Sequence, residues 1–280
     1  MGPERRLRVY LAGGIALQGP EGAVIGERAF AGRQARRLFV RLATIHGPVP
    51  QEDLADFLWG AGWPAAWQVA LRALVSKLRT TLAQVHASPT IASRDGTYEL
   101  RLPADAWLDI DAAADAIHRA ETSLNSGDPA GACGWALASR AISSRPLLSG
   151  EESEWLDDLR LWLGDVRLRS LECLGEIWLS SGDPDAAARD ASEAITIDPF
   201  RESAHRLLIR AYLAAGEHGA AIRAYLACRE QFREELGVLP SPETVALVNV
   251  TLDVGQDGAT SGSRAREMLG EPGQRGREAR

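Results

Sequence analysis

The most regular spacing of apolar and polar positions lies between residues 63 and 102. In the run WPAAWQVALRALVSKLRTTL, apolar side chains recur every three or four residues, which predicts one amphipathic helix with a single face on a core. In the following run, TIASRDGTYELRL, Asp95 and Gly96 separate two strand-like segments. Asp-Gly pairs adopt the positive backbone angles of a type I′ turn, so this run predicts a tight hairpin. The expected core positions of the helix are Trp67, Leu71, Leu74, Val75, Leu78 and Leu82.

The residues before this helix predict a small sheet and two further helices. RLRVYLAGGIALQ alternates like one short strand, and we expect EGAVIG to pair with it. Residues 33–45 have helical spacing and end at the breaker sequence His46-Gly47-Pro48, after which Pro50 opens a short helix, QEDLADFLWG. A loop over residues 60–64 leads to the third helix. This order of sheet, three helices and hairpin predicts a winged helix-turn-helix domain that ends near Pro103.

From Leu108 onward the pattern is helical and repetitive. Three segments share a Leu-x-x-Gly turn followed by an alanine-rich helix: LNSGDPAGACGWALASRAI, LSSGDPDAAARDASEAITIDP and LAAGEHGAAIRAYLACREQF. Gly182 and Gly216 are 34 residues apart, which is the tetratricopeptide period. Asp128-Pro129 and Asp183-Pro184 have the form of an N-cap with proline at the first helical position. We expect a longer helix over residues 151–180 and the last ordered helix over residues 241–252.

These patterns predict a mainly α fold with small β-sheets, in two domains and a tail. A winged helix-turn-helix domain is expected over residues 1–107, and an all-α tetratricopeptide-like domain over residues 108–252. The length of 280 residues is sufficient for two ordinary domains. Residues 253–280 are mostly Gly, Ser, Glu and Arg, and we expect this tail to be disordered.

Charge distinguishes the two parts of the chain. From Met1 to Asp109 there are 13 basic and 10 acidic side chains, whereas the remainder has 18 basic and 28 acidic ones. The first part is therefore the candidate for nucleic-acid binding, and the acidic remainder is expected to face elsewhere. No apolar run approaches the ~20 residues of a membrane span, and the start lacks the features of a cleaved leader. We expect a cytoplasmic, nucleoid-associated protein that contacts no membrane.

The predicted third helix carries the main candidate DNA contacts. Arg72, Ser76 and Thr80 lie on successive turns opposite the core stripe, where they are expected to reach base edges. Arg72 is the best candidate base reader, because an arginine can donate two parallel hydrogen bonds to guanine. Lys77 and Arg79 lie on the flanks of this face, which favours phosphate contacts that position the protein.

Other arginines extend the candidate surface. Arg94, at the hairpin turn, is expected to contact the minor groove or a phosphate. Arg36 and Arg37 belong to a run of arginines without an intervening acid, and they either contact DNA or only solvate the first helix. The predicted DNA-binding residues are Gln68, Arg72, Ser76, Lys77, Arg79, Thr80, Arg94, Arg36 and Arg37.

Enzymatic chemistry and ligand binding find little support in the sequence. The histidines are scattered, no His-x-x-x-His or Cys-x-x-Cys pair is present, and we expect neither a metal nor a cofactor. The acidic cluster after Gly150 is ordinary for the first turn of a helix. The cysteines Cys133, Cys173 and Cys228 are odd in number and far apart, which favours buried thiols over disulfides. Four tryptophans at helical spacing are expected to pack in the core rather than line a ligand pocket: Trp135, Trp155, Trp162 and Trp178.

Several separate motifs together resemble one family. GRQARRLFVRLATIHGPVPQEDLADFLWG, LRALVSKLRTTL and SRDGTYELRLP are similar to the winged-helix domain of the actinobacterial antibiotic regulatory proteins, the SARPs. LDIDAAADAIHRAE, PLLSGEESEWLDDLRLWLGDVRLRSLECLGE and AYLACREQFREELGVLPSPET resemble the bacterial transcriptional activator domain that follows in that family. The resemblance covers roughly residues 7–252, in family order.

The resemblance implies a transcriptional activator of a secondary-metabolite gene cluster. Such a protein binds direct repeats in double-stranded promoter DNA, with its recognition helix in the major groove, and recruits RNA polymerase holoenzyme. A homodimer on DNA is a further arrangement to consider. Trp59 and Trp63 flank the loop before the recognition helix, where related winged helices contact polymerase, and hydrophobic anchoring of that loop is the alternative.

Two other functions fit the same sequence. One is a tetratricopeptide-type adaptor whose winged helix no longer binds DNA, which the acidic second helix and the net charge of −7 favour. The other is a repressor of the same fold, which would differ only in the position of its operator.

Overall fold

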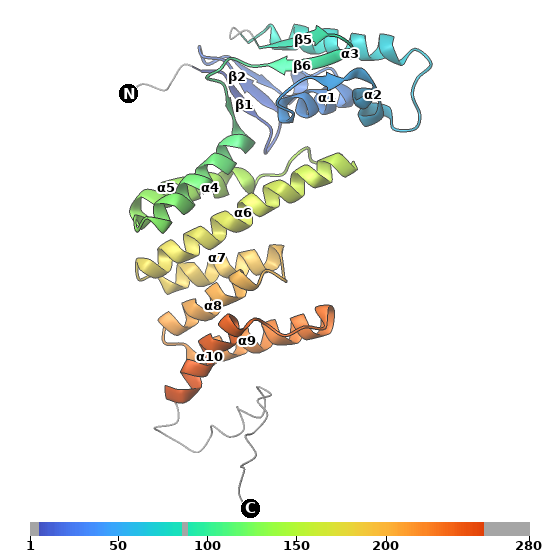
Figure 1. Ribbon diagram of the computed structural model, residues 1–280. Coiled ribbons are helices and arrows are strands. Elements are labelled where there is room, and N and C mark those ends of the chain that lie inside the picture. Colours follow the sequence, from blue (N-terminus) through green and yellow to red (C-terminus); the bar gives the residue numbers. More distant parts are fainter. Residues whose placement is uncertain (1–5, 86–88, 255–280) are drawn as a thin grey trace, which may run out of the picture. The chain divides into compact units, whose positions relative to one another are not determined.

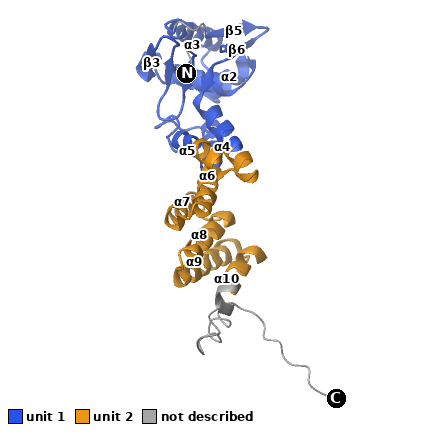
Figure 2. Ribbon diagram, turned by 90° about the vertical axis from the view of Figure 1, so that its left-hand side faces the viewer, with its two compact units in different colours: residues 1–119, 137–167 blue, residues 120–136, 168–280 orange. Residues whose placement is uncertain are grey.

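The computed structural model describes residues 6–85 and 89–254, and it divides into two compact units (Figure 2). The first unit comprises residues 1–119 and 137–167, and the second comprises residues 120–136 and 168–280. The predicted class, mainly α with small β-sheets, is confirmed. The first unit groups residues 137–167 with the N-terminal sheet, whereas the expected domain limits at residues 107 and 252 remain a prediction.

The chain begins with a four-stranded sheet in the order β3-β2-β1-β7 (Figure 1). Strands β1 (Arg8–Tyr10), β2 (Ala16–Gln18) and β3 (Val24–Gly26) pair antiparallel, and β7 (Trp107–Leu108) pairs parallel with β1. The prediction of one strand across RLRVYLAGGIALQ is wrong, because Gly13 and Gly14 turn the chain there with positive φ angles of 84° and 121°. The expected pairing of EGAVIG with this segment is confirmed.

Three helices of the first unit correspond to the three predicted ones. They are α1 (Arg33–Thr44), α2 (Gln51–Trp59) and α3 (Trp67–Leu82), and a short 3-10 turn, η1 (Glu27–Ala29), precedes α1. Burying one leucine fully contributes about 1.5–3 kcal/mol, so the rows of leucines on these helices stabilise the unit. The buried side chains include Leu38, Phe39, Leu42, Leu54, Leu58, Leu71, Val75, Leu78 and Leu82.

A second sheet of three strands has the order β4-β6-β5. Strand β4 (Val49–Pro50) directly precedes α2, while β5 (Thr90–Arg94) and β6 (Thr97–Arg101) form the predicted hairpin. Ile91 and Tyr98 turn inward from the two strands. The hairpin is thereby packed on the same core as the buried face of α3.

The remaining helices follow one another through the rest of the described chain (Figure 1). They are α4 (Asp109–Asn125), α5 (Pro129–Ser143), α6 (Glu154–Ser180), α7 (Pro184–Ile197), α8 (Glu202–Ala214), α9 (His218–Gln231) and α10 (Pro242–Val254), with a π-helical turn, η2 (Phe232–Leu236), after α9. Helix α6 begins three residues later than expected, and α10 ends two residues later. The predicted disorder of the tail concerns residues 255–280, which lie outside the described residues.

The three Leu-x-x-Gly turns have the same hydrogen bonds. The glycines at positions 127, 182 and 216 all have φ angles between 76° and 80°, the left-handed region in which glycine ends a helix at little cost. The next residue donates its N–H to a carbonyl five residues back: Asp128 to Ser123, Asp183 to Trp178 and Glu217 to Tyr212, at 2.8–2.9 Å. The side chains of Asp128 and Asp183 then accept the N–H groups of Gly131 and Ala186, as N-caps do. The predicted repeat of turn and cap chemistry is confirmed.

The tryptophans divide into two groups. Trp155 packs edge-on against Phe57, with 5.1 Å between ring centroids, and the guanidinium of Arg41 lies 5.0 Å from the Trp155 ring. Trp178 is partly buried and donates its indole N–H to Asp190 at 2.9 Å. Trp135 and Trp162 are 44% and 40% exposed, so the prediction of core packing is wrong for these two.

The three cysteines are free thiols. Cys173 and Cys228 are buried, and burial raises their pKa values to about 11 and about 12. Cys133 is half-buried. The expectation of buried thiols is therefore confirmed for two of the three. Their raised pKa values keep Cys173 and Cys228 protonated at neutral pH and poorly nucleophilic.

Candidate nucleic-acid interface

Helix α3 is divided along its length into a buried face and an exposed face. Leu71, Val75, Leu78 and Leu82 are buried in the core of the first unit, as the three- and four-residue spacing predicts. The candidate contact residues on this helix are all exposed: Gln68, Arg72, Ser76, Lys77, Arg79 and Thr80. The predicted orientation of the helix is therefore confirmed, and its polar candidate residues face solvent.

Arg72 and Lys77 have few intramolecular partners. The Nε atom of Arg72 donates to the carbonyl of Gln68 at 3.2 Å, along its own helix. Among the described residues no partner is found for its two terminal amino groups, nor for the ammonium of Lys77. Two parallel N–H groups of a guanidinium are the donors that a guanine edge accepts. The side chain of Arg72 is therefore chemically available for that contact.

Arg79 has a different role in the structure. Its Nε and Nη2 atoms both donate to the carbonyl oxygen of Ile91 in β5, at 2.9 and 2.7 Å. These two hydrogen bonds from a charged donor join α3 to the hairpin. Arg79 is predicted from the sequence to contact a phosphate, whereas the structure places its guanidinium on the backbone of β5.

Replacing Arg79 is expected to loosen the hairpin. Hydrogen bonds from charged donors contribute about 1.5–3 kcal/mol, and we expect Arg79→Ala to lower the free energy of unfolding by about 1–2 kcal/mol, because Arg79 is partly solvated. Urea denaturation measures the loss, and amide exchange of residues 90–101 locates it. Lys77→Ala on the same helix is the matched control and is expected to be neutral. Equal unfolding midpoints for the two variants would refute this role of Arg79.

The hairpin turn is built as its sequence predicts. Asp95 and Gly96 have φ angles of 48° and 76°, the two positive values of a type I′ turn. Thr97 donates its hydroxyl to the carbonyl of Arg94 at 2.7 Å, and Gln51 donates its N–H to the carbonyl of Gly96 at 3.0 Å. Arg94 is exposed and pairs with the equally exposed Asp95 at 3.1 Å. Exposed ion pairs are weak, so this pair does not prevent Arg94 from meeting a phosphate.

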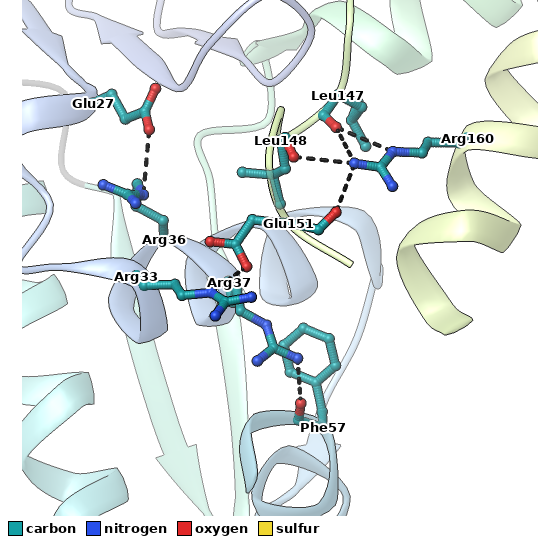
Figure 3. A network of polar contacts seen from close by, with 9 residues as sticks. All are labelled: Glu27, Arg33, Arg36, Arg37, Phe57, Leu147, Leu148, Glu151 and Arg160. Carbon is teal, nitrogen blue, oxygen red and sulfur yellow. Dashed lines mark hydrogen bonds and ion pairs between the residues drawn. The ribbon is translucent and has the colours of Figure 1, made fainter. Parts of the chain in front are cut away.

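The arginines of α1 are engaged within the first unit (Figure 3). Arg36 pairs with Glu27 at 3.3 Å. Arg37 donates to the carbonyl of Phe57 at 2.8 Å, and its guanidinium lies 4.9 Å from the centre of that ring. Burial lowers the pKa of Arg37. Of the alternatives left by the sequence, neither DNA contact nor plain solvation describes Arg37 well, because its side chain fastens α1 to α2.

A network that the sequence analysis missed lies beside these arginines (Figure 3). Glu151 is buried and accepts a hydrogen bond from Arg33 at 2.6 Å, so its interpretation as an ordinary residue of a helix start is wrong. Arg160 donates to the carbonyls of Leu147, Leu148 and Glu151 at 2.9–3.3 Å. No local signal marks these contacts, because they join residues 9 to 118 positions apart.

Asp109 is a second residue that the sequence analysis did not single out. Its buried carboxylate accepts the N–H groups of Leu11, Ala12 and Ile110 at 2.9–3.0 Å. Burial raises the pKa of Asp109, against the opposing effect of these three donors. The only sequence signal is an aspartate that directly follows a strand and opens a helix, and this signal does not identify its distant partners.

Trp59 and Trp63 border the loop between α2 and α3. Trp59 is partly buried and packs against the core. Trp63 donates its indole N–H to Asp56 at 3.0 Å, and its ring lies 4.9 Å from that of Trp67. These contacts favour the alternative in which the two tryptophans anchor the loop.

Two further features of the described chain bear on function. Within residues 6–85 and 89–254, no three His, Cys, Asp or Glu side chains lie together as metal ligands would. In the same residues, no helix has the length and apolar character that crossing a membrane requires.

Comparisons with known proteins identify relatives of the chain. The model of the bacterial transcriptional activator domain matches residues 108–251. The regulatory protein AfsR of Streptomyces coelicolor is 28% identical over 190 residues, which are 68% of this chain and 19% of that protein. AfsR of Streptomyces griseus is 28% identical over 195 residues, or 70% of this chain and 20% of that protein. The chain thus matches about a fifth of the length of these curated relatives.

One solved structure has a similar fold over most of the chain. Mycobacterium tuberculosis EmbR, solved in complex with a low affinity phosphopeptide, superimposes with a TM-score of 0.80 at 19% sequence identity. The similarity covers 94% of this chain and 69% of that one. At this identity the likeness concerns the fold alone, and it agrees with the order of N-terminal sheets followed by consecutive helices. The family match covers half of the sequence and leads to one conclusion: the chain belongs to the bacterial transcriptional activator domain family.

Proposed function

We propose that this protein is a sequence-specific DNA-binding activator of transcription, with α3 as its recognition helix. One observation carries the proposal: α3 buries four apolar residues on one side and exposes a polar, partly cationic row on the other, next to the β5–β6 hairpin. Recognition helices of winged helix-turn-helix proteins enter the major groove with such a face. In this proposal residues 1–107 form the DNA-binding domain and residues 108–252 the activator domain.

The residues of the interface divide by chemistry. Arg72 is proposed to read guanine, with Gln68, Ser76 and Thr80 facing neighbouring base edges. Lys77 is proposed to meet a phosphate, together with Arg94 from the hairpin turn. Arg36, Arg37 and Arg79 are bonded within the first unit, so we assign them positioning functions.

The wider function rests on membership of the family. We propose that the protein acts in the cytoplasm, at promoter DNA with direct repeats, controls genes of antibiotic or other secondary metabolism, and recruits RNA polymerase holoenzyme. The loop with Trp59 and Trp63 is one candidate polymerase contact, and a homodimer on DNA is one candidate assembly. The acidic part of the chain after Asp109 supports protein partners rather than DNA for the helices that follow, because like charges repel.

The test is a gel-shift experiment with a duplex enriched from a random pool by the full chain, against a shuffled duplex. Arg72→Ala is expected to lower discrimination between the two duplexes by about 1–3 kcal/mol, because a bidentate guanine contact is lost. Lys77→Ala is expected to weaken both complexes equally and to reduce the slope of log K against log salt by about 1. Arg233→Ala, an exposed arginine of the second unit, is the control. If both α3 variants bind as the wild type does, α3 is not the reading element.

A second candidate function is a tetratricopeptide-type adaptor that does not bind DNA. The net charge of −7 and the exposed acids of α2, Glu52, Asp53 and Asp56, favour it. Fluorescence anisotropy with random duplex DNA at low salt separates the two functions. Binding that weakens steeply with added salt supports the regulator, since counterion release drives non-specific association. Absence of binding under these conditions supports the adaptor.

A further inference from the structure

The exposed face of α3 that carries Gln68, Arg72, Ser76 and Thr80, here called the reading face, contains one feature that hydrogen bonding does not explain. Val69 is 62% exposed on this face, between Gln68 and the turn that carries Arg72. Ala73, one turn further on, is also exposed. The N-terminal half of α3 therefore presents an apolar strip within a row of polar side chains.

Single exposed hydrophobic residues are common, and exposure alone assigns no function. The position of Val69 is more informative than its exposure. It lies at the N-terminal end of the helix, where recognition helices reach base edges, and its neighbours Gln68 and Arg72 have side chains that pair with adenine and guanine. Valine is also a poorer helix former than alanine, so helix stability does not favour it there.

We propose that Val69 is a specificity-determining residue that contacts the C5-methyl group of a thymine in the major groove. This inference rests on the proposed function, since it names what part of the reading face recognises. On the major-groove edges of the four base pairs, the thymine methyl is the apolar group, whereas the other positions are hydrogen-bond donors and acceptors. Val69 contributes the methyl contact, and Ala73 continues the apolar strip along the groove.

The spacing on the helix also predicts where this thymine lies. Val69 and Arg72 are three residues apart, or about 4.5 Å along the helix axis. Successive bases of one strand are about 3.4 Å apart along the duplex. The thymine is therefore expected within about two base pairs of the guanine read by Arg72.

Replacing thymine by uracil tests the contact, because it removes the methyl group and leaves base pairing unchanged. The probe is the duplex that the full wild-type chain enriches from a random pool, with each thymine replaced in turn. Burial of one methyl-sized group gives about a fourfold difference in affinity, so one replacement near the guanine is expected to weaken wild-type binding about fourfold. The same replacement is expected to have no effect on the DNA affinity of Val69→Ala. The two proteins and the two duplexes form a double-mutant cycle, and its coupling energy isolates the contact.

The chain offers a matched control for Val69. Val24, in β3 of the same unit, is 64% exposed and lies outside α3, so Val24→Ala loses the same two methyl groups at another surface. It is expected to retain the wild-type sensitivity to uracil. A second selection with Val69→Ala is expected to relax the preference for thymine at that one position.

The outcomes separate the two proposals. If the wild type enriches no sequence, DNA reading itself fails, and the thymine contact fails with it. If a sequence is enriched but wild type and Val69→Ala respond identically to every uracil replacement, only the thymine contact is overturned. A loss of binding by Val69→Ala that is equal at all thymines also overturns it, because that pattern shows a general effect on the helix.

Discussion

Asp109→Ala is expected to lower the free energy of unfolding by about 3 kcal/mol. The buried carboxylate of Asp109 accepts three backbone N–H groups, and without it the donors of Leu11, Ala12 and Ile110 lose their partner. An unsatisfied buried donor costs about 1–3 kcal/mol, and removing a charge whose burial is itself unfavourable offsets part of the total. Denaturant unfolding of the full chain, followed by circular dichroism, measures the change.

Two variants sharpen this test. Asp109→Asn keeps the size of the side chain but turns an amide donor toward backbone donors, so it is expected to be nearly as unstable as Asp109→Ala. Asp111→Ala removes a half-exposed aspartate two positions further along α4, whose ion pair with His46 is exposed, and is expected to cost less than about 1 kcal/mol. A stable Asp109→Asn protein would show that neither the negative charge nor the second acceptor oxygen of Asp109 is required.

Arg160→Ala is expected to have the second largest effect, a loss of about 2–3 kcal/mol. The guanidinium of Arg160 is bonded to the carbonyls of Leu147, Leu148 and Glu151, and bonds to a charged group are stronger than neutral ones. Leu148 has a φ angle of 44°, which is unfavourable for a residue with a branched side chain. We expect the segment over residues 144–153 to open first when this guanidinium is removed.

Hydrogen exchange and limited proteolysis of residues 144–153 locate this effect. Arg160→Lys keeps the charge but lacks the planar fork of donors, so it is expected to restore only part of the stability. Arg233→Ala is the control, because its ion pair with Glu230 is exposed. If residues 144–153 of Arg160→Ala are as protected from exchange and proteolysis as in the wild type, Arg160 does not hold this segment in place.

The contacts of α1 also explain why its arginine-rich sequence does not indicate a phosphate-binding surface. A run of arginines without acids is typical of a surface that meets phosphates. In the folded chain, Arg36 pairs with Glu27 and Arg33 pairs with Glu151. Arg37 donates to the backbone carbonyl of Phe57. The partners lie between 9 and 118 residues away, so charge counting along the chain cannot show that the positive charge is compensated.

The sequence by itself determined the elements whose physics is local. The spacing of leucines in α3, the positive angles at Asp95 and Gly96 and the shared turns at Gly127, Gly182 and Gly216 follow from neighbours within about one or two helical turns. For the same reason the exposed face of α3, and with it Arg72 and Lys77, could be predicted. A period of three to four residues defines which side chains share a face before any tertiary contact forms.

Only the tertiary structure decided what each exposed or charged side chain meets. It placed Arg79 on the carbonyl of Ile91, Asp109 on the loop that follows β1, and Trp135 and Trp162 at the surface. It also divided the first predicted strand in two and added β7 to its sheet. Periodicity shows that a side chain lies on one face of an element, but the partner of that face depends on the path of distant segments, which local spacing does not encode.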